Sequence, residues 1–522
     1  MVILSAPNAS PPGVRAGVWT DARTFALVLA ALLVVRIAAL MVSPLNLHFD
    51  EAQYWLWSRT LDWGYFSKPP LIAWVIAATT ALFGNGEWAV RLGAALAHAA
   101  GAAAVYALAA RAYGSRAALW AGLLWLTLPA LWLSSFVIST DALMLPLWAA
   151  ALYCFWRLKE APSPGWGALL GLCVGAGALA KYAMLYFILC AALAALWSPA
   201  ARRALLSWPG AIAGAAALLV LAPNLAWNAA HDFETVAHTA SNANLGGRLF
   251  RPDELLKFLG GQAAVIGPVL FVALIWFLAK AARAPARLDE TARTLLAFTL
   301  PPLVIIMAQA LVSRANANWA AAAYPAASVL LAGWLAATTN GRRALWAALA
   351  TQAALGAIVL AALALPTFAD ALGQGRAIKR MRGWDAMAAE TAARASEAPY
   401  TAVLADHRAG YFELRYYWRD RSDLPPVRAW RLHAAPENHA EATDPMRPED
   451  SARVLVVHMV KDYAPLVIDD FARVTPLGQS PLRVGSVEGA LFYSRGEGYA
   501  EKPRDAAYEA RLERIRDEAN AQ

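Results

Sequence analysis

Two adjacent carboxylates, Asp50 and Glu51, stand in a stretch that follows the first apolar run and is crowded with aromatic rings. From His48 to Pro70 the chain reads HFDEAQYWLWSRTLDWGYFSKPP, with seven such rings and with Lys68 just before two prolines. Charges among so many rings are typical of a segment at a membrane surface, where charge is expensive and usually functional. A carboxylate held there could act as a general base toward a hydroxyl group. The alternative for Asp50 is a structural role, as the N-cap of a helix that begins at Glu51.

A third carboxylate, Asp141, opens a later apolar run in the sequence STDALMLP. We predict a catalytic role for it, and the alternative is again an N-cap, here of a helix over residues 142–157. Lys181 interrupts the apolar sequence GALAKYAMLYF, where a lysine either snorkels to the membrane surface or binds an anion. Several cations near carboxylates predict an anionic ligand such as a lipid-linked phosphate. The predicted phosphate-binding cations are Lys68, Lys181, Arg248 and Arg251.

Two polar loops supply further candidates for contact with a substrate. The first, residues 227–255, contains His231 and His238, whose seven-residue spacing could place both on one helix face as metal ligands. Two histidines without a clear third ligand do not complete a metal site, so we expect no required cofactor and keep a divalent metal as the alternative. The second loop, SRANANW at 313–319, either reads sugar hydroxyls or is an ordinary loop with an aromatic anchor. The residues predicted to contact substrate are Tyr54, Tyr65, His238, Arg314, Asn316, Asn318 and Tyr324.

The composition predicts the environment in which these residues work. Hydrophobic residues make up 59% of the 522 residues and charged residues only 16%, which is outside the range of soluble domains and indicates a polytopic membrane protein. The net charge of +8 is better explained by basic cytoplasmic loops than by nucleic acid binding. The three cysteines all lie in apolar runs, so they predict buried side chains and no disulfide framework.

Apolar runs of about 20 residues, the length that crosses a bilayer, predict roughly eleven transmembrane helices. Residues 71–83 form a shorter apolar segment, which we interpret as an interfacial or half-buried helix. If the N-terminus is cytoplasmic, every short cytoplasmic loop is basic, as the positive-inside rule requires. The predicted spans are 25–43, 87–109, 117–137, 142–157, 166–181, 183–198, 207–226, 256–279, 294–312, 322–338 and 344–365.

An odd number of spans places the chain after residue 365 on the outer face, together with the loop of Asp50. Its composition changes to frequent charged residues, and β-type runs at 401–404, 454–457 and 490–493 alternate with helical segments such as 384–396. The tail 501–522 is typical of a charged surface helix. We therefore predict three domains: a cytoplasmic segment 1–24, a transmembrane domain 25–365 and a soluble α/β domain 366–522.

The order of these motifs resembles a known family. An acidic pair in the first outer loop, then GYFSKPPL, then STDAL, then ALAKY is similar to membrane glycosyltransferases of the GT-C fold, especially family 39. Its bacterial relatives include aminoarabinose and galacturonosyl transferases of lipid A and core, and protein O-mannosyltransferases. The likeness covers roughly residues 20–340. It implies a GT-C-type α-helical membrane protein of about eleven transmembrane helices, with interfacial helices in the first periplasmic loop and a C-terminal α/β periplasmic domain.

The resemblance implies an inverting transfer of a sugar from a polyprenyl-phosphate donor to a periplasmic acceptor such as lipid A, core oligosaccharide or another glycan. Asp50 matches the catalytic acid, Glu51 would support it, and Lys68 matches the lysine that contacts the donor phosphate. Asp141 and Lys181 match an acidic and a basic position of the cavity. Two positions depart from the aminoarabinose enzymes. Ser67 replaces an acidic residue, which argues against their particular sugar. Gln53 replaces an arginine.

The resemblance also implies partners and a location. The partners would be a lipid-linked donor, a lipid or glycan acceptor and membrane lipids, without nucleic acid. The location would be the bacterial inner membrane, with the active site and the C-terminal domain facing the periplasm. Three alternatives remain at this point, namely a protein O-glycosyltransferase, a transporter or flippase of a lipid-linked sugar, and a ligase or polymerase that moves whole glycans. A transporter would place charges inside its spans, and Arg36 and Arg91 are the candidates for such positions.

Overall fold

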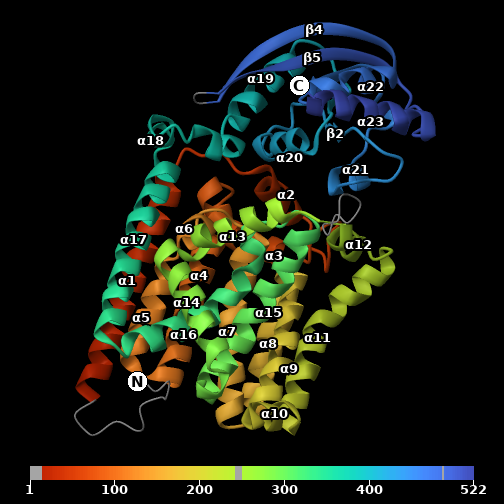
Figure 1. Cartoon of the computed structure of the whole chain (residues 1–522). Coiled ribbons are helices and arrows are strands. Elements are labelled where there is room, and N and C mark those ends of the chain that lie inside the picture. Colours follow the sequence, from red (N-terminus) through yellow and green to blue (C-terminus); the bar gives the residue numbers. More distant parts are fainter. Residues whose placement is uncertain (1–14, 242–249, 485–486, 522) are drawn as a thin grey trace. The chain divides into compact units, whose positions relative to one another are not determined.

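The computed structural model describes residues 15–241, 250–484 and 487–521, which fall into two compact units (Figure 1). Unit 1 comprises Met1–Val42 and Lys68–Leu360, and unit 2 comprises Ser43–Ser67 and Ala361–Gln522. The segment Ser43–Ser67, which carries the acidic pair, therefore belongs to the same compact unit as the C-terminal residues. The three predicted domains and their boundaries stay predictions.

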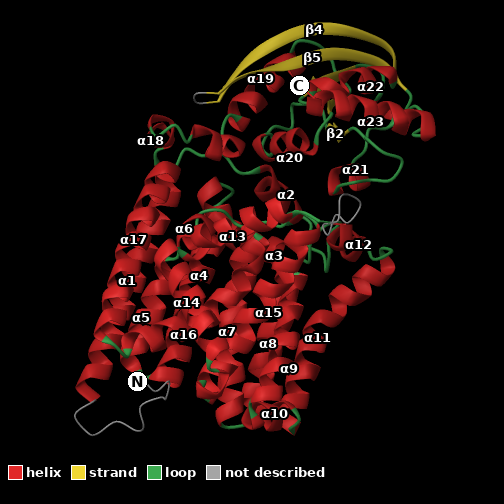
Figure 2. Cartoon of the chain, in the orientation of Figure 1, coloured by secondary structure: helices red, strands yellow, loops and turns green. Residues whose placement is uncertain are grey.

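Unit 1 is helical throughout its described residues (Figure 2). Pairs of neighbouring helices such as α4 with α5, α7 with α8 and α8 with α11 pack along one another. Its elements are α1 Arg15–Val42, α3 Leu71–Phe83, α4 Glu87–Tyr113, α5 Ser115–Thr127, α6 Pro129–Ser134, α7 Thr140–Glu160, α8 Pro164–Ala180, η2 Tyr182–Leu185, α9 Tyr186–Trp197, α10 Pro199–Leu205, α11 Trp208–Ala230, α12 Glu234–Ser241, α13 Pro252–Ile266, α14 Pro268–Arg283, η3 Pro285–Arg287, α15 Glu290–Val312, η4 Ala317–Ala323, α16 Tyr324–Ala336 and α17 Thr339–Ala364.

The prediction that this region consists of apolar, membrane-type helices is confirmed, whereas the count of eleven spans stays a prediction. Within the described residues, 6 helices are long and apolar enough to cross a membrane, or up to 7 if the bent pair of α13 and α14 counts as one span. Helices α8 and α9, predicted as spans over 166–181 and 183–198, fall short of that length. The predicted interfacial segment 71–83 is helix α3.

Two predicted spans are interrupted by proline. The run 256–279 is not one helix, because α13 ends at Ile266 and α14 leaves at an angle of 115°. Gly267 makes this turn with φ +92°, a conformation that favours glycine, and Pro268 then begins α14 without an amide donor. The run 117–137 is similarly divided into α5 and α6, before Pro129.

Buried polar side chains bond the carbonyl groups that these interruptions expose. Arg36 of α1 donates to the Leu126 carbonyl at 2.6 Å, near the end of α5. Gln352 of α17 accepts from the Thr127 hydroxyl at 2.8 Å and donates to the Ile266 carbonyl, also at 2.8 Å. Gln352 is fully buried, so it links the two interrupted helices through satisfied hydrogen bonds.

Unit 2 is built on a five-stranded mixed sheet of order β2-β1-β3-β5-β4 (Figure 2). The predicted α/β character is confirmed, and helix α19 has the predicted bounds 384–396. Strands β2, β1 and β3 are parallel, while β5 runs antiparallel to β3 and β4. The predicted runs correspond to β1, β3 and part of β5, whereas β2 and β4 were not predicted. The strands are β1 Ala402–Ala405, β2 Val427–Ala429, β3 Val454–His458, β4 Phe471–Val484 and β5 Val487–Tyr499.

The helices of unit 2 pack around this sheet and include α2, which carries the acidic pair. They are α2 Phe49–Trp57, α18 Pro366–Ala371, η5 Gly375–Met381, α19 Trp384–Ser396, α20 Arg408–Tyr417, α21 His439–Thr443, η6 Pro448–Asp450, η7 Lys461–Tyr463, α22 Ala464–Asp469 and α23 Ala506–Ala521. The tail helix α23 is more than a surface helix, because Leu512 is fully buried in the core cluster with Val456 and Phe471.

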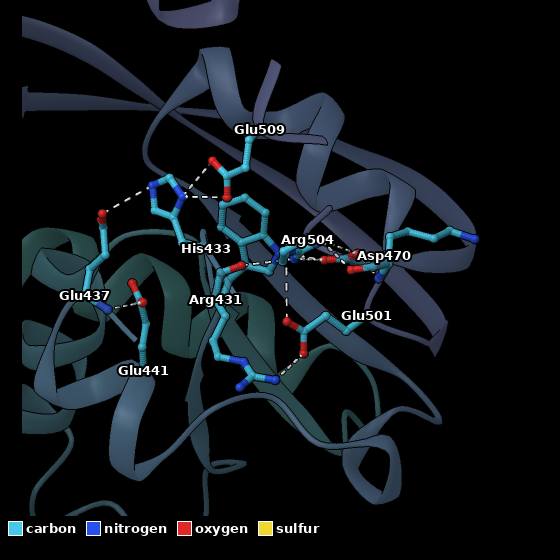
Figure 3. A network of polar contacts seen from close by, with 10 residues as sticks. Arg431, His433, Glu437, Glu441, Asp470, Glu501, Arg504 and Glu509 are labelled. Atoms are coloured by element: carbon cyan, nitrogen blue, oxygen red, sulfur yellow. Dashed lines mark hydrogen bonds and ion pairs between the residues drawn. The ribbon is translucent and has the colours of Figure 1, made fainter. Parts of the chain in front are cut away.

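A buried ion pair ties this tail to the sheet (Figure 3). Arg504 binds Asp470 through both carboxylate oxygens, at 3.0 and 2.6 Å, and the two side chains are 2% and 0% exposed. The Trp430 indole and the Lys502 amide also donate to Asp470, at 2.8 and 2.7 Å. This many donors satisfy a buried carboxylate, so we interpret the network as a structural anchor for α23.

Candidate active site

Helix α2 carries the acidic pair, and its N-terminus explains one of the two carboxylates. The N-cap is His48, whose Nδ1 accepts the Asp50 amide at 3.2 Å, while Glu51 accepts the His48 amide at 2.9 Å. This reciprocal pair is a capping box. Glu51 is only 1% exposed, and the His48 amide is a structural partner for its buried carboxylate. Asp50 is not the N-cap, which removes the structural alternative considered for it.

The Asp50 side chain is 38% exposed and its main partner comes from the C-terminal part of unit 2. Arg408 Nη2 lies 3.2 Å from Asp50 Oδ1, and Arg408 Nη1 donates to Gln53 Oε1 at 3.3 Å. The guanidinium also stacks on Phe49, 4.8 Å from the ring centroid. Arg408 was not among the residues predicted from the sequence. Residues 355 positions apart in the chain, such as Gln53 and Arg408, give no local signal of contact.

The two predicted tyrosines of this loop are buried in its own packing. Tyr65 stacks on Trp57 with ring centroids 4.6 Å apart, and its hydroxyl lies 3.0 Å from the carbonyl oxygens of Trp57 and Thr60. Burial raises the pKa of Tyr65 to about 12. Tyr54 packs 5.3 Å from Trp57 and is 7% exposed. Both rings therefore shape the loop that presents Asp50.

In unit 1 three predicted site residues come together. Lys181 Nζ lies 2.8 Å from Asp141 Oδ1 and 2.9 Å from Oδ2, and Asn318 Nδ2 donates to Asp141 Oδ2 at 2.8 Å. The N-cap of α7 is Ser139, which accepts the Ala142 amide at 3.2 Å, so Asp141 is not the cap. Lys181 is paired with a carboxylate, so snorkelling alone does not account for its position. We call Asp141, Lys181 and Asn318 the unit 1 polar cluster.

Further polar residues, which were not predicted from the sequence, lie on α13, η2 and α11. Gln262 is 1% exposed, receives a hydrogen bond from the Tyr324 hydroxyl at 2.5 Å and donates to the Ala317 carbonyl at 3.0 Å. Tyr182, which follows Lys181, bonds Asn224 and Asn228 of α11 at 2.8 and 3.0 Å. An asparagine or glutamine inside an apolar run is the signal that could have found them, because such a group needs a partner.

The remaining predicted cations and donors lie outside the unit 1 polar cluster. Lys68 is half-buried before α3, and Arg314 and Asn316 are exposed. Arg251 bonds Asp253 and Glu254 of the first turn of α13, at 3.3 and 3.2 Å. Arg248 lies outside the described residues.

The two histidines considered as metal ligands belong to different elements. His231 caps the end of α11 and stacks on Trp227 at 4.0 Å, whereas half-buried His238 lies in α12. They therefore do not share one helix face. Within the described ranges, no group of three His, Cys, Asp or Glu side chains could hold a metal ion. The expectation of no required cofactor stays a prediction.

Comparisons with known proteins identify the family and the fold of the chain. Residues 67–227, which include Lys68, Asp141 and Lys181, match the family described as dolichyl-phosphate-mannose-protein mannosyltransferase. The chain is 38% identical over 402 residues to RgtD, a lipid A galacturonosyltransferase of Rhizobium johnstonii, with 74% of this chain and 81% of RgtD covered. It is 29% identical to RgtA, a lipopolysaccharide core galacturonosyltransferase of the same organism, over 45% of this chain and 49% of RgtA.

Solved structures show the same fold. ArnT from Cupriavidus metallidurans aligns with a TM-score of 0.57 in its apo state and 0.59 bound to undecaprenyl phosphate, at 18% and 17% identity. Each alignment covers 92% of this chain and 99% of ArnT. The resemblance stated from the motifs is therefore confirmed. Since RgtD shares 38% identity over 81% of its length, this chain belongs to the family of GT-C membrane glycosyltransferases that includes RgtD.

Proposed function

We propose that this glycosyltransferase moves galacturonic acid from a polyprenyl-phosphate donor to lipid A, with inversion at the anomeric carbon. The observation that carries the proposal is the 38% identity to RgtD, whose name states both the sugar and the lipid acceptor. ArnT, which has the same fold, has been solved with undecaprenyl phosphate, and this supports a polyprenyl-phosphate donor. Core oligosaccharide is the second candidate acceptor, because RgtA acts on it by name.

In this proposal Asp50 accepts the proton of the acceptor hydroxyl. The freed oxygen bonds the anomeric carbon from the face opposite the leaving group, the bond from that carbon to the phosphate oxygen breaks, and the polyprenyl phosphate departs. The position of Asp50 supports this role, because the carboxylate is partly exposed and its helix is already capped by His48. Glu51 supports the reaction by fixing the first turn of α2.

We assign the donor phosphate to the cations Lys68, Lys181, Arg248 and Arg251, which stabilise the negative charge as it develops. The unit 1 polar cluster supports this for Lys181, because Asp141, which Asn318 also bonds, fixes the Lys181 side chain while 26% of it stays exposed. Asp141 thus acts mainly by orienting Lys181. Arg314, Asn316, Asn318 and His238 are proposed to contact the sugar or the acceptor.

The buried cation Arg36 favours an enzyme over a transporter. Arg36 bonds the Leu126 carbonyl and stacks on Trp132 at 4.9 Å, so a charge inside a span has a structural partner. A transporter would instead use such a charge along a transport path. We propose that the first outer loop and unit 2 face the periplasm of the inner membrane, because the basic loops then lie in the cytoplasm.

Mass spectrometry of lipid A, core and polyprenyl-phosphate fractions tests the proposal. A strain without the gene is complemented with the wild type, with Asp50→Asn or with Asp62→Asn, an exposed carboxylate of the same loop that serves as the control. We expect one hexuronic acid to be missing from lipid A in the deletion and Asp50→Asn strains, with its polyprenyl-phosphate form accumulating. The Asp62→Asn strain should match the wild type.

Other outcomes identify the alternatives. Loss of the sugar from core or from protein would replace lipid A as the acceptor. Unchanged glycans in a strain that produces well-folded Asp50→Asn would remove Asp50 as the base. Alkaline phosphatase fused after Gln522 tests the orientation, since it is active only in the periplasm, and an inactive but intact fusion would reverse the proposed topology.

A further inference from the structure

Arg408 occupies a position in unit 2 where α/β proteins often place functional residues. Strand β1 lies between the parallel strands β2 and β3, and the chain leaves its carboxyl end through Asp406 and His407. His407 caps α20 by accepting the Ala409 amide at 3.1 Å, which makes Arg408 the first residue of that helix. In open α/β sheets, ligands bind outside the carboxyl ends of parallel strands. Here that edge presents Arg408 to helix α2.

The Arg408 guanidinium makes three contacts with α2. It lies 3.2 Å from Asp50 Oδ1, donates to Gln53 Oε1 at 3.3 Å and stacks over the Phe49 ring at 4.8 Å. The side chains of Arg408 and Asp50 are 35% and 38% exposed. An ion pair this open to solvent contributes little to stability. Its three-point geometry instead fixes the orientation of one carboxylate.

The two oxygens of Asp50 have different surroundings. Oδ1 faces Arg408, whereas Oδ2 lies 3.7 Å from His48 Nδ1. That nitrogen accepts the Asp50 amide hydrogen, so it carries no proton to donate to Oδ2. Burial also lowers the pKa of His48, which favours the neutral ring. Oδ2 is therefore the oxygen suited to accept a proton from a substrate.

Other helices of unit 2 also pack against the rest of α2. Trp55 meets the Tyr416 ring of α20 edge to face, with centroids 5.0 Å apart, and Trp57 meets His439 of α21 at 5.5 Å. The helix that carries Asp50 is thus packed on the same helix, α20, that begins with Arg408.

We propose that Arg408 is a positioning residue for sugar transfer. It holds Asp50 Oδ1 so that Oδ2 points to the acceptor hydroxyl, which makes the C-terminal part of the chain a component of the catalytic apparatus. This inference rests on the proposed role of Asp50 as the base. In the reaction Oδ2 takes the hydroxyl proton, the acceptor oxygen bonds the anomeric carbon, and the phosphate leaves with the electrons of the broken bond.

Steady-state kinetics of the purified full chain test the proposal, with a hexuronyl polyprenyl phosphate as donor and lipid A as acceptor. The variants are Arg408→Gln, Arg408→Lys and Asp50→Asn, and the control is Arg421→Gln, which removes an arginine paired with Asp423 on the surface of unit 2. We expect Arg408→Gln to lower kcat by about 10- to 100-fold, the effect of a misplaced catalytic group. The KM for the donor should change little, and Arg408→Lys should recover part of kcat because it keeps the charge without the planar fork.

The outcomes separate this inference from the proposed function. If Asp50→Asn is inactive and Arg408→Gln keeps the wild-type kcat, the positioning role is overturned while the role of Asp50 stands. If Asp50→Asn is active, the proposed base is wrong and the inference falls with it. A further variant, Arg408→Ala, separates positioning from folding. If Arg408 only stabilises the fold, Arg408→Gln has a lower melting temperature and added methylguanidinium does not restore kcat in Arg408→Ala. That result overturns the positioning role. Restoration of kcat by methylguanidinium supports the positioning role.

Discussion

Lys181 Nζ lies within 2.9 Å of both carboxylate oxygens of Asp141, although the two residues are 40 positions apart and belong to different helical segments. The Asp141 side chain is 15% exposed, and Asn318 satisfies it further. A carboxylate this buried depends on its cation, because an uncompensated charge in such surroundings is costly. The pair therefore joins the start of α7 to the end of α8 at a fixed geometry.

The first prediction concerns this pair. Lys181→Met should leave Asp141 without its cation and lower the free energy of unfolding by about 1–3 kcal/mol, with loss of transfer activity. Asp141→Asn with Lys181→Met should be less destabilising than the sum of the single changes. Thermal unfolding in detergent measures this. The control Arg111→Gln breaks an exposed ion pair with Glu160 on the same α7 and should have a small effect, and strictly additive changes would contradict a coupled pair.

The second prediction concerns the link between interrupted helices. Gln352→Leu should remove the amide that donates to the Ile266 carbonyl and cost about 1–3 kcal/mol of stability, while the Thr127 hydroxyl keeps the Leu123 carbonyl as an acceptor at 2.9 Å. The neighbouring half-buried Thr351, changed to Val, is the matched control because its hydroxyl bonds the Ala347 carbonyl within α17. Equal melting temperatures for the two variants would show that the link does not stabilise the bundle.

The third prediction separates a structural from a substrate role for Tyr324. The side chain is 1% exposed and its hydroxyl is bonded to Gln262. We expect Tyr324→Phe to lower stability by about 1 kcal/mol and to leave the KM for donor and acceptor unchanged. A raised KM with unchanged stability would return Tyr324 to the substrate-contact residues predicted from the sequence.

Residue type and apolar context were sufficient to predict several features. A lysine and an aspartate inside apolar runs are unusual enough to be noticed, and Asp141 and Lys181 do come together. The helical membrane character and helix α19 followed from hydropathy and periodicity.

Other features depended on information that a single sequence lacks. Arg408 and Gln53 meet from 355 positions apart, and no local pattern marks such a pair. An N-cap role was the structural alternative for Asp50 and Asp141, yet His48 and Ser139 take these positions. A cap is decided by backbone conformation, and several neighbouring residues were chemically able to fill it. Gln262 and Gln352 were overlooked because a neutral amide in an apolar run is less conspicuous than a charge.

The last prediction concerns the pH dependence of unit 2. Burial lowers the pKa of His407, His439 and His458 to about 4, below the usual value of 6.5. A lowered pKa means that the unfolded chain binds protons first, so stability is full above pH 6.5 and is lost as the pH falls toward 4. At pH 5 the buried His458, which is 4% exposed, costs about 2 kcal/mol, whereas solvent screens the effect of His407 on the surface. The free energy of unfolding of unit 2 should therefore be lower in acid.

Asp406 acts in the opposite direction, which gives the prediction a sharp test. Burial raises the pKa of Asp406 to about 7, although its carboxylate accepts the Met459 amide at 2.9 Å. The folded state binds this proton more tightly, so Asp406 contributes stability at low pH that is lost as the pH rises through about 7. It offsets part of the histidine effect, and Asp406→Asn should make the loss of stability between pH 7 and 5 steeper. Hydrogen exchange of β3 peptides, corrected for intrinsic rates, measures the loss, and a shallower pH dependence in the variant would contradict this assignment.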